Sequence, residues 1–151
     1  GQWTVGFGGF GEILPNPENR FVLSAQKDKW GLPVLEFSAE FGQNELQMRV
    51  DMMNEAATML EAAGFKNINA YNKPDTHIGL GIHEMGTARM GTSVKNSIVN
   101  KHNQVHEVKN VFMTDGAVMA SASCVNPSLT YMAMTARAAD FAVSELKKKN
   151  L

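Results

Sequence analysis

The sequence predicts an α+β protein, with a mainly antiparallel sheet flanked by helices and a C-terminal strand–turn–helix unit. The first ~40 residues alternate β-forming stretches with turn residues. Two later segments instead carry apolar residues at three- and four-residue steps, which is the spacing of a helix. At 151 residues, one domain is the expected count, with a segment that rests on a partner.

An antiparallel hairpin is predicted near the N-terminus. Residues 20–24 are β-forming and follow the turn-rich run 15–19, and a second β-forming stretch covers residues 32–39. The polar, glycine-containing residues 27–31 between them fit a hairpin turn.

A helix is predicted between Asn44 and Gly64. Asparagine is a good N-cap, and glycine is common just past the end of a helix. The apolar residues between them recur at helical spacing: Leu46, Val50, Met53, Ala57 and Leu60.

Short strands are expected at residues 67–71, 97–100 and 110–114, with a polar loop or hairpin between the last two. The final helix is predicted to begin near Pro127 or Ser128. Proline suits the first turn of a helix, because the backbone nitrogen there needs no hydrogen. Its face of apolar and small residues comprises Leu129, Met132, Ala133, Ala136, Ala139 and Phe141. The run of lysines at 147–149 suits a helix C-terminus and is interpreted as a solvated tail.

Composition and charge exclude several classes of protein. A chain that is 44% hydrophobic and 19% charged is globular rather than disordered. With a net charge of -1 and no basic face, nucleic acid is not expected as a partner. The single cysteine, Cys124, cannot form an internal disulfide, and no apolar run approaches the about 20 residues of a membrane span.

The chain opens with Gly1 and Gln2 rather than methionine, and no secretion signal is visible. We therefore expect a piece of a longer protein, in which a targeting segment can lie upstream. Localisation is left open, with the cytoplasm and the periplasm both possible.

One pattern spells the dinucleotide-binding motif without its context. Residues 6–11 read G-x-G-x-x-G, which binds dinucleotides only between a strand and a helix. Pro15 and Pro17 follow too soon for a helix to form. We expect a flexible or bulged segment here.

The four histidines raise the question of a metal site, but their spacing along the chain does not favour one. His83 begins a zinc-protease-like pattern, but Thr87 stands where the second histidine is required. His102 and His106 are four residues apart in a predicted loop, where a surface pair is favoured over a metal site. A small metal-binding domain that also uses His77 is kept as an alternative function.

The sequence around His83 is suited to chemistry. Gly81 and Gly86 flank the histidine and let the backbone approach a ligand. A neutral imidazole near pH 7 can act as a general base. A lone histidine is more often structural, so this feature decides nothing alone.

Two further sites follow in the chain. Asp115 and Gly116 end a predicted strand, where ligands collect in open α/β sheets, although an ordinary Asp-Gly turn is the simpler alternative. Asn126 and Pro127 open the last helix, whose first amides suit an anion or an electron-rich ring. Asn126 is also a good N-cap, and both roles are compatible.

Together these segments resemble the C-terminal signature of the glucose-methanol-choline oxidoreductases. That pattern is a histidine, three residues, a threonine and a Met-Gly pair, then a strand into Asp-Gly, then Asn-Pro or His-Pro opening a helix with Ala, Arg and Ala-Asp. The match is strong over residues 81–91 and 110–140, and looser over residues 14–33. Several motifs in order are far more specific than any one of them.

The resemblance implies an FAD-dependent oxidoreductase that acts on CH–OH groups of alcohols or sugars. His83 would be the catalytic base and Asn126 the second polar residue of the catalytic pair, so the two side chains should converge on one pocket. Thr87 and Arg89 would support them. The cofactor contacts would come from Asp115, Gly116, Asn126, Pro127 and Ser128.

The resemblance also implies how the chain is organised. About residues 1–91 would form the substrate-side sheet and helix, ending in the loop of the catalytic histidine. About residues 92–151 would return to the flavin domain, where the strand–turn–helix would complete an FAD-binding domain. The N-terminal FAD-binding Rossmann part is absent, so the expected partners are that missing part and a small alcohol or sugar. We expect the chain alone to be an inactive fragment that does not retain FAD. A non-catalytic binding or interaction module with the same framework remains an alternative.

Overall fold

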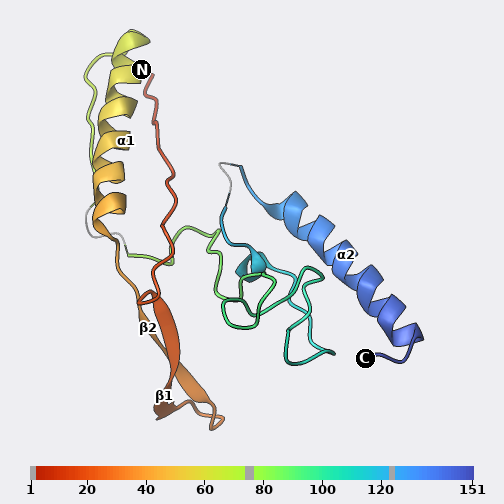
Figure 1. Ribbon diagram of the computed structural model, residues 1–151. Helices are drawn as coiled ribbons and strands as arrows, with labels where there is room; N and C mark the ends of the chain where they lie inside the picture. Colours follow the sequence, from red (N-terminus) through yellow and green to blue (C-terminus); the bar gives the residue numbers. More distant parts are fainter. Residues whose placement is uncertain (1–2, 74–76, 123–124) are drawn as a thin grey trace. The chain divides into compact units, whose positions relative to one another are not determined.

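The computed structural model describes residues 3–73, 77–122 and 125–151. Its elements are, in order, β1 (Arg20–Lys27), β2 (Pro33–Ser38), helix α1 (Gln43–Ala62), the short 3-10 helix η1 (Gly116–Val118) and helix α2 (Ser128–Lys147) (Figure 1). The antiparallel sheet and the two long helices confirm the predicted α+β class. The chain divides into two compact units, Gly1–Leu80 and Gly81–Leu151.

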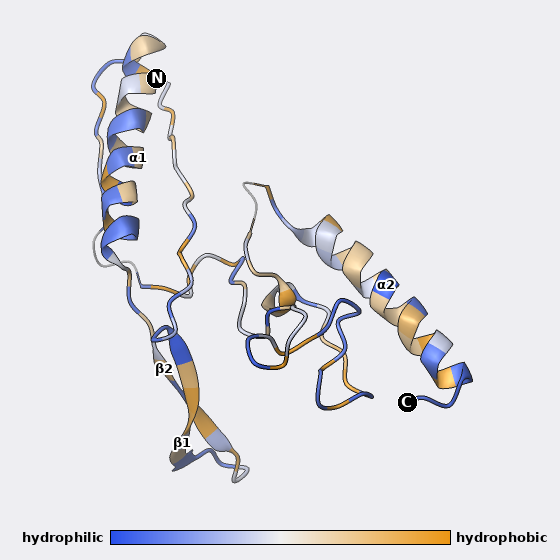
Figure 2. Cartoon of the chain, viewed as in Figure 1, coloured by the Kyte–Doolittle hydropathy of each residue, from blue (hydrophilic) through white to orange (hydrophobic). Residues whose placement is uncertain are grey.

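The predicted hairpin is confirmed in the first unit. β1 pairs with β2 antiparallel, and Phe21 stands opposite Phe37 with their ring centroids 5.8 Å apart. In the turn, the Asp28 carboxylate accepts the amides of Trp30 at 2.9 Å and Leu32 at 3.0 Å. All β2 side chains are exposed, so cross-strand pairing and the turn hold the hairpin together, while apolar residues line its surface (Figure 2).

Helix α1 begins earlier than predicted. Gly42, in an extended conformation, is the N-cap, and its carbonyl accepts the first helical bond from Leu46 at 3.1 Å. The prediction of Asn44 as N-cap is therefore wrong. Instead of a capping asparagine, the buried Glu45 anchors the first turn by accepting the amide of Leu14 at 3.0 Å.

The end of α1 matches the prediction. Gly64 has a φ of 85°, a left-handed conformation that glycine adopts without strain. Its amide donates to the Glu61 carbonyl at 2.9 Å, and the Phe65 amide donates to the Leu60 carbonyl at 3.0 Å. This pair of bonds is a Schellman motif, which satisfies the last carbonyls of the helix.

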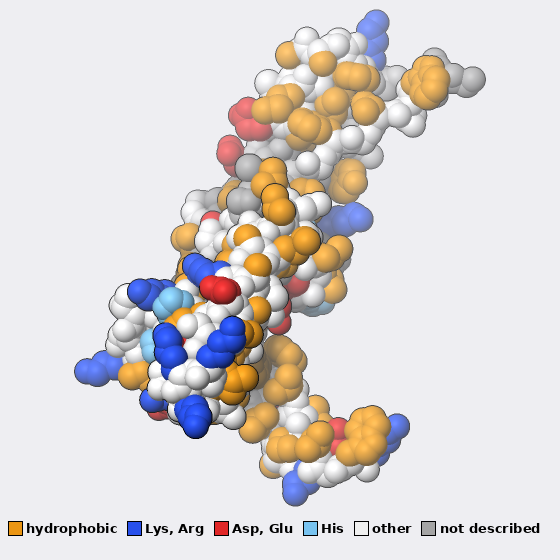
Figure 3. All heavy atoms as spheres, turned by 90° about the vertical axis from the view of Figure 1, so that its right-hand side faces the viewer, with side chains coloured by type: hydrophobic (Ala, Val, Ile, Leu, Met, Phe, Trp, Pro, Cys, Tyr) orange, Lys and Arg blue, Asp and Glu red, His pale blue; other side chains and the backbone are white. Residues whose placement is uncertain are grey.

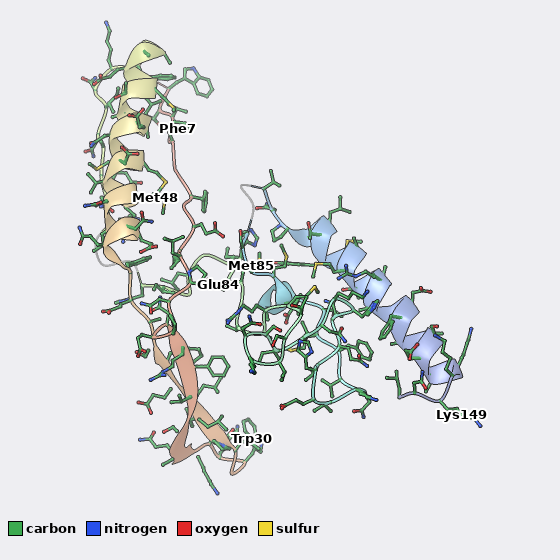
Figure 4. The ribbon with its side chains drawn as sticks, in the orientation of Figure 1. Phe7, Trp30, Met48, Glu84, Met85 and Lys149 are labelled. Atoms are coloured by element: carbon green, nitrogen blue, oxygen red, sulfur yellow. The ribbon has the colours of Figure 1, made fainter. Side chains whose placement is uncertain are left out.

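The glycine-rich segment before the hairpin packs against α1 (Figures 1 and 4). A Cβ added to Gly11 would lie 2.5 Å from Met48 Cε, and one added to Gly9 would lie 3.0 Å from Met52 Sδ. The small residues thus let an extended backbone lie close to the methionines. No helix follows residues 6–11 before the hairpin, so the segment lacks the context of a dinucleotide-binding motif.

The second unit is built largely from loops joined by single bridges. Val99 pairs with Met90 in parallel and with Val105 antiparallel, and Gln104 pairs with Phe112 antiparallel. The predicted strands at 97–100 and 110–114 are therefore wrong, and residues 67–71 of the first unit form no strand either.

Asparagine side chains explain why the ladders in the second unit stay short. Asn100 Oδ1 accepts the amides of His102 at 2.8 Å and Gln104 at 3.3 Å, which replaces ladder bonds with local turns. Asn103 is fully buried with a φ of 63°, and its side chain donates to the Met113 carbonyl at 2.8 Å. The chain is thus folded by side-chain bonds where the sequence predicted paired strands.

Helix α2 begins at Ser128, as predicted, and one side of it packs on these loops. Ala138 is buried, Arg137 donates to Asn103 Oδ1 at 3.1 Å, and Phe141 stacks on His102 with ring centroids 3.9 Å apart. The other side is exposed, and hydrophobic side chains are visible along it in Figure 3. Its members are Leu129, Met132, Ala136, Ala139, Val143 and Leu146, which we call the α2 stripe.

Among the described residues, neither helix combines the length and the hydropathy required to cross a bilayer. Cys124 lies outside the described residues.

Candidate active site

The second unit brings together His83 and Asn126, which are 43 positions apart in the chain. His83 Nε2 lies 3.0 Å from Asn126 Oδ1, within hydrogen-bond distance. The imidazole is half-buried and Asn126 is exposed. A polar pair expected to converge thus lies in direct contact at a surface that a ligand can reach.

His83 lies within a tight turn, residues 81–84, which we call the histidine turn. The Gly81 amide donates to Glu84 Oε1 at 2.7 Å, so the side chain of Glu84 closes a ring around Ile82 and His83. Ile82 has a φ of 72°, a left-handed conformation that is rare for a β-branched residue. The pKa of the Glu84 carboxyl is lowered by hydrogen bonds from its own amide and from those of Gly81 and Ile82, with a smaller contribution from His83, although partial burial opposes the shift.

The residues that follow the turn are fixed to η1 and α2. Tyr131 Oη donates to Met85 Sδ at 3.6 Å (Figure 4 labels Met85 beside Glu84). The amides of Ala88 and Met90 donate to the carbonyls of Ala117 at 2.9 Å and Val118 at 2.8 Å. The C-terminal side of the histidine turn is therefore held by hydrogen bonds to η1 and to α2.

The predicted Asp-Gly turn is the start of η1. Asp115 is exposed, and its Oδ1 caps η1 by accepting the Ala117 amide at 2.9 Å. Gly116 is buried, and a Cβ there would lie 2.7 Å from Tyr131 Oη and 3.1 Å from the Glu84 carbonyl oxygen. A glycine at position 116 thus allows three segments to pack closely there.

The start of α2 differs from the expectation in one respect. Pro127 is the N-cap, with a φ of -89°, and no side chain of the described residues caps the helix. Asn126 is therefore not the N-cap. Its carboxamide instead contacts His83. The first amides of a helix have no acceptor within it, so they remain hydrogen-bond donors beside this pair. Ser128, the first helical residue, is exposed there.

Sequence reasoning missed two residues of this site, Glu84 and Tyr131. Glu84 acts through a local hydrogen bond from the Gly81 amide, and Tyr131 through contacts with Met85 and Gly116, and no motif spells out either role. The one usable signal is that Tyr131 stands four positions after Pro127, which places it one helical turn from the helix start.

The other histidines do not gather around a metal site in the described part of the chain. His102 stacks on Phe141, and His106 Nε2 lies 3.0 Å from Ser97 Oγ. Across residues 3–73, 77–122 and 125–151, no three side chains of His, Cys, Asp or Glu are close enough to share an ion. The metal-binding alternative thus finds no ligand cluster there.

Comparison with known proteins defines the class of the chain. A family model for GMC oxidoreductase matches residues 15–135, so the chain belongs to the glucose-methanol-choline oxidoreductase family. The resemblance predicted from the sequence is confirmed.

Three curated relatives illustrate the similarity. The chain is 35% identical over 136 residues to 2-methyl-1,2-propanediol dehydrogenase of Mycolicibacterium austroafricanum, covering 87% of this chain and 24% of the relative. It is 33% identical over 140 residues to the fructose dehydrogenase large subunit of Gluconobacter japonicus, covering 91% and 25%. It is 29% identical over 136 residues to paromamine 6'-oxidase of Streptomyces fradiae, covering 90% and 25%. The chain spans about a quarter of the length of these curated relatives.

Proposed function

We propose that this chain is the C-terminal catalytic portion of an FAD-dependent oxidoreductase that oxidises CH–OH groups of an alcohol or a sugar. The observation that carries the proposal is the contact between His83 Nε2 and Asn126 Oδ1 at 3.0 Å, beside the start of α2. A relative named for a diol and another named for fructose support this substrate class.

The donors around this pair fit a flavin ring. The electron-rich edge of an isoalloxazine accepts hydrogen bonds, and the first amides of α2 are donors at the positive end of the helix. The exposed Asp115 carboxylate adds a polar group at the start of η1. We expect the residues that hold the cofactor to be Asp115, Gly116, Asn126, Pro127 and Ser128. When bound, FAD supplies the hydride acceptor of the reaction.

The proposed role of His83 is to accept the hydroxyl proton of the substrate. The alcohol loses this proton from oxygen and a hydride from carbon, and a carbonyl forms. A positioned base typically contributes about 10²–10⁴ in rate. To act at Nε2, the neutral ring must carry its hydrogen on Nδ1 and present a lone pair at Nε2.

The proposed role of Asn126 is to stabilise the substrate oxygen as negative charge develops on it. With Oδ1 toward the ring, a hydrogen bond between the two requires a proton on Nε2, as is present after proton transfer. A half-turn of the carboxamide presents Nδ2–H instead, which can donate to the substrate oxygen. Loss of one such donor typically costs about 10²–10³ in rate.

The test is His83→Ala in the full-length flavoprotein that contains this chain. We expect turnover of alcohols and sugars to be nearly abolished while FAD, measured by its absorbance, remains bound. His77→Ala is a matched control, because His77 is exposed and belongs to the first unit. Near-normal turnover in His83→Ala would refute the assignment. Flavin-loaded wild-type protein inactive on a panel of alcohols and sugars would instead favour a non-catalytic module.

A further inference from the structure

We propose that Glu84 is a positioning residue for His83, because its carboxylate closes the turn of residues 81–84 and so fixes the direction of the imidazole. This inference rests on the proposed function of His83. Glu84 is not itself placed against the reacting atoms. Its effect on the reaction would pass entirely through the backbone that carries the base.

The turn contains a conformation that must be held from outside. Ile82 adopts a φ of 72° although it is β-branched, and such a residue keeps this conformation only where its surroundings enforce it. Ile82 is 88% exposed, so burial does not supply the restraint. The bond from the Gly81 amide to Glu84 Oε1, at 2.7 Å, spans Ile82 and does supply one.

Glu84 is well placed to act as a clamp, since its own backbone is fixed. Its carbonyl oxygen packs against Gly116, where a Cβ would approach to 3.1 Å. The next residue, Met85, receives the hydroxyl of Tyr131 at 3.6 Å. The Glu84 side chain thus reaches back from an anchored backbone to the Gly81 amide at the start of the turn. His83 lies between these two fixed points.

The chemistry of the acceptor suits this role. Backbone amides of Glu84, Gly81 and Ile82 hold the pKa of the Glu84 carboxyl below its ordinary value of 4.5. The group is therefore charged near pH 7, and a hydrogen bond to a charged acceptor is stronger than a neutral one. Among the described residues, Asn126 is the one side chain that hydrogen-bonds the imidazole, so the backbone of the turn must supply the rest of its orientation.

The experiment compares Glu84→Ala with Glu84→Gln in the full-length flavoprotein. Glutamine keeps an acceptor oxygen at the same reach, whereas alanine removes it. We expect Glu84→Ala to lower kcat by about 10- to 100-fold, since a small misplacement of a reacting group can cost about that much. KM and FAD content should stay near the wild-type values, and Glu84→Gln should recover most of kcat. Glu107→Ala is the control, because Glu107 is an exposed carboxylate of the same unit.

A second readout does not depend on turnover. Hydrogen exchange of residues 81–84, followed by mass spectrometry, should be faster in Glu84→Ala and near wild-type in Glu84→Gln. Wild-type kcat and exchange in Glu84→Ala would overturn the inference, as would equal damage from both substitutions or loss of FAD together with kcat.

The outcomes also separate this inference from the proposed function. If His83→Ala is inactive while Glu84→Ala behaves as the wild type, the clamp alone is rejected. If His83→Ala retains turnover, the proposed function falls, and the inference about Glu84 falls with it.

Discussion

Gly116 and Tyr131 lie so close that a Cβ on Gly116 would stand 2.7 Å from the tyrosine hydroxyl oxygen. The Glu84 carbonyl oxygen would be 3.1 Å away on the same Cβ. Position 116 is therefore where η1, α2 and the histidine turn meet. The absence of a side chain there leaves room for this packing.

Gly116→Ala should destabilise the second unit. Forcing a methyl group into a packed site typically costs about 1–3 kcal/mol, so we expect a lower midpoint in chemical denaturation. Gly8→Ala is the control, because nothing lies within 4 Å of a Cβ at position 8. Adding Tyr131→Phe should restore part of the loss by removing the hydroxyl. A midpoint for Gly116→Ala equal to that of the control would mean that the contact is easily relieved.

Asn126→Ala should lower kcat without changing stability. The carboxamide is the proposed donor to the substrate oxygen, and losing such a donor costs about 10²–10³ in rate. Because Pro127 is the N-cap, α2 should keep its start, and the melting temperature should match the wild type. Asn126→His offers a ring N–H in place of the amide, and we expect partial activity. Asn110→Ala serves as the control at an exposed asparagine, and wild-type kcat in Asn126→Ala would exclude the role.

The local features of the fold were predictable because short-range chemistry fixes them. The hairpin turn is set by Asp28, and the end of α1 is set by a glycine at position 64. The strands predicted at residues 97–100 and 110–114 are wrong because side-chain hydrogen bonds to the backbone, which β-propensity does not reveal, decide the structure there. Their β-forming residues were visible, but whether Asn100 and Asn103 would turn inward and satisfy the backbone was not.

In the candidate site too, sequence motifs predicted some residues, and only the folded structure revealed the others. His83 and Asn126 could be named together because an ordered set of motifs connects them across the chain, although spacing alone does not predict their contact. Glu84 and Tyr131 carry no motif of their own. Their importance depends on the φ of Ile82 and on the approach of Gly116, which are properties of the folded backbone.

The 151-residue chain alone should bind free FAD weakly or not at all. Its G-x-G-x-x-G segment is extended and packs on α1, so it provides no helix N-terminus for a pyrophosphate. In the proposed complex, the start of α2 would contribute donors to the flavin ring rather than to the pyrophosphate. Titration of FAD fluorescence with the purified chain checks this, and the full-length flavoprotein is the control. Stable, stoichiometric flavin on the isolated chain would contradict it.

The isolated chain should also self-associate through the α2 stripe. Its six residues follow alternating three- and four-residue steps, and four of them are large: Leu129 is 78% exposed, Met132 67%, Val143 51% and Leu146 64%. An apolar helix face with this spacing pairs readily with a similar one. We expect sedimentation velocity to show oligomers at micromolar concentration, and Met132→Lys with Val143→Lys to shift them to monomer. Thr92→Lys with Asn110→Lys adds the same two charges at exposed positions outside the stripe and is the control for charge. A monomeric wild-type chain would contradict the prediction.

The stacked pair His102 and Phe141 should make the second unit less stable in acid. Burial against the ring, with help from the charges of Lys101 and Arg137, lowers the pKa of His102 below its ordinary value of 6.5, although Glu145 opposes the shift. The folded state therefore binds this proton less readily than the unfolded state. The resulting stability is fully present above pH 6.5 and is lost as the pH falls through the lowered pKa. An NMR titration should place the His102 midpoint below 6.5, and Phe141→Leu should raise it. In His102→Gln the pH dependence of the denaturation midpoint over this range should weaken, whereas an unchanged pH dependence would show that other groups cause it.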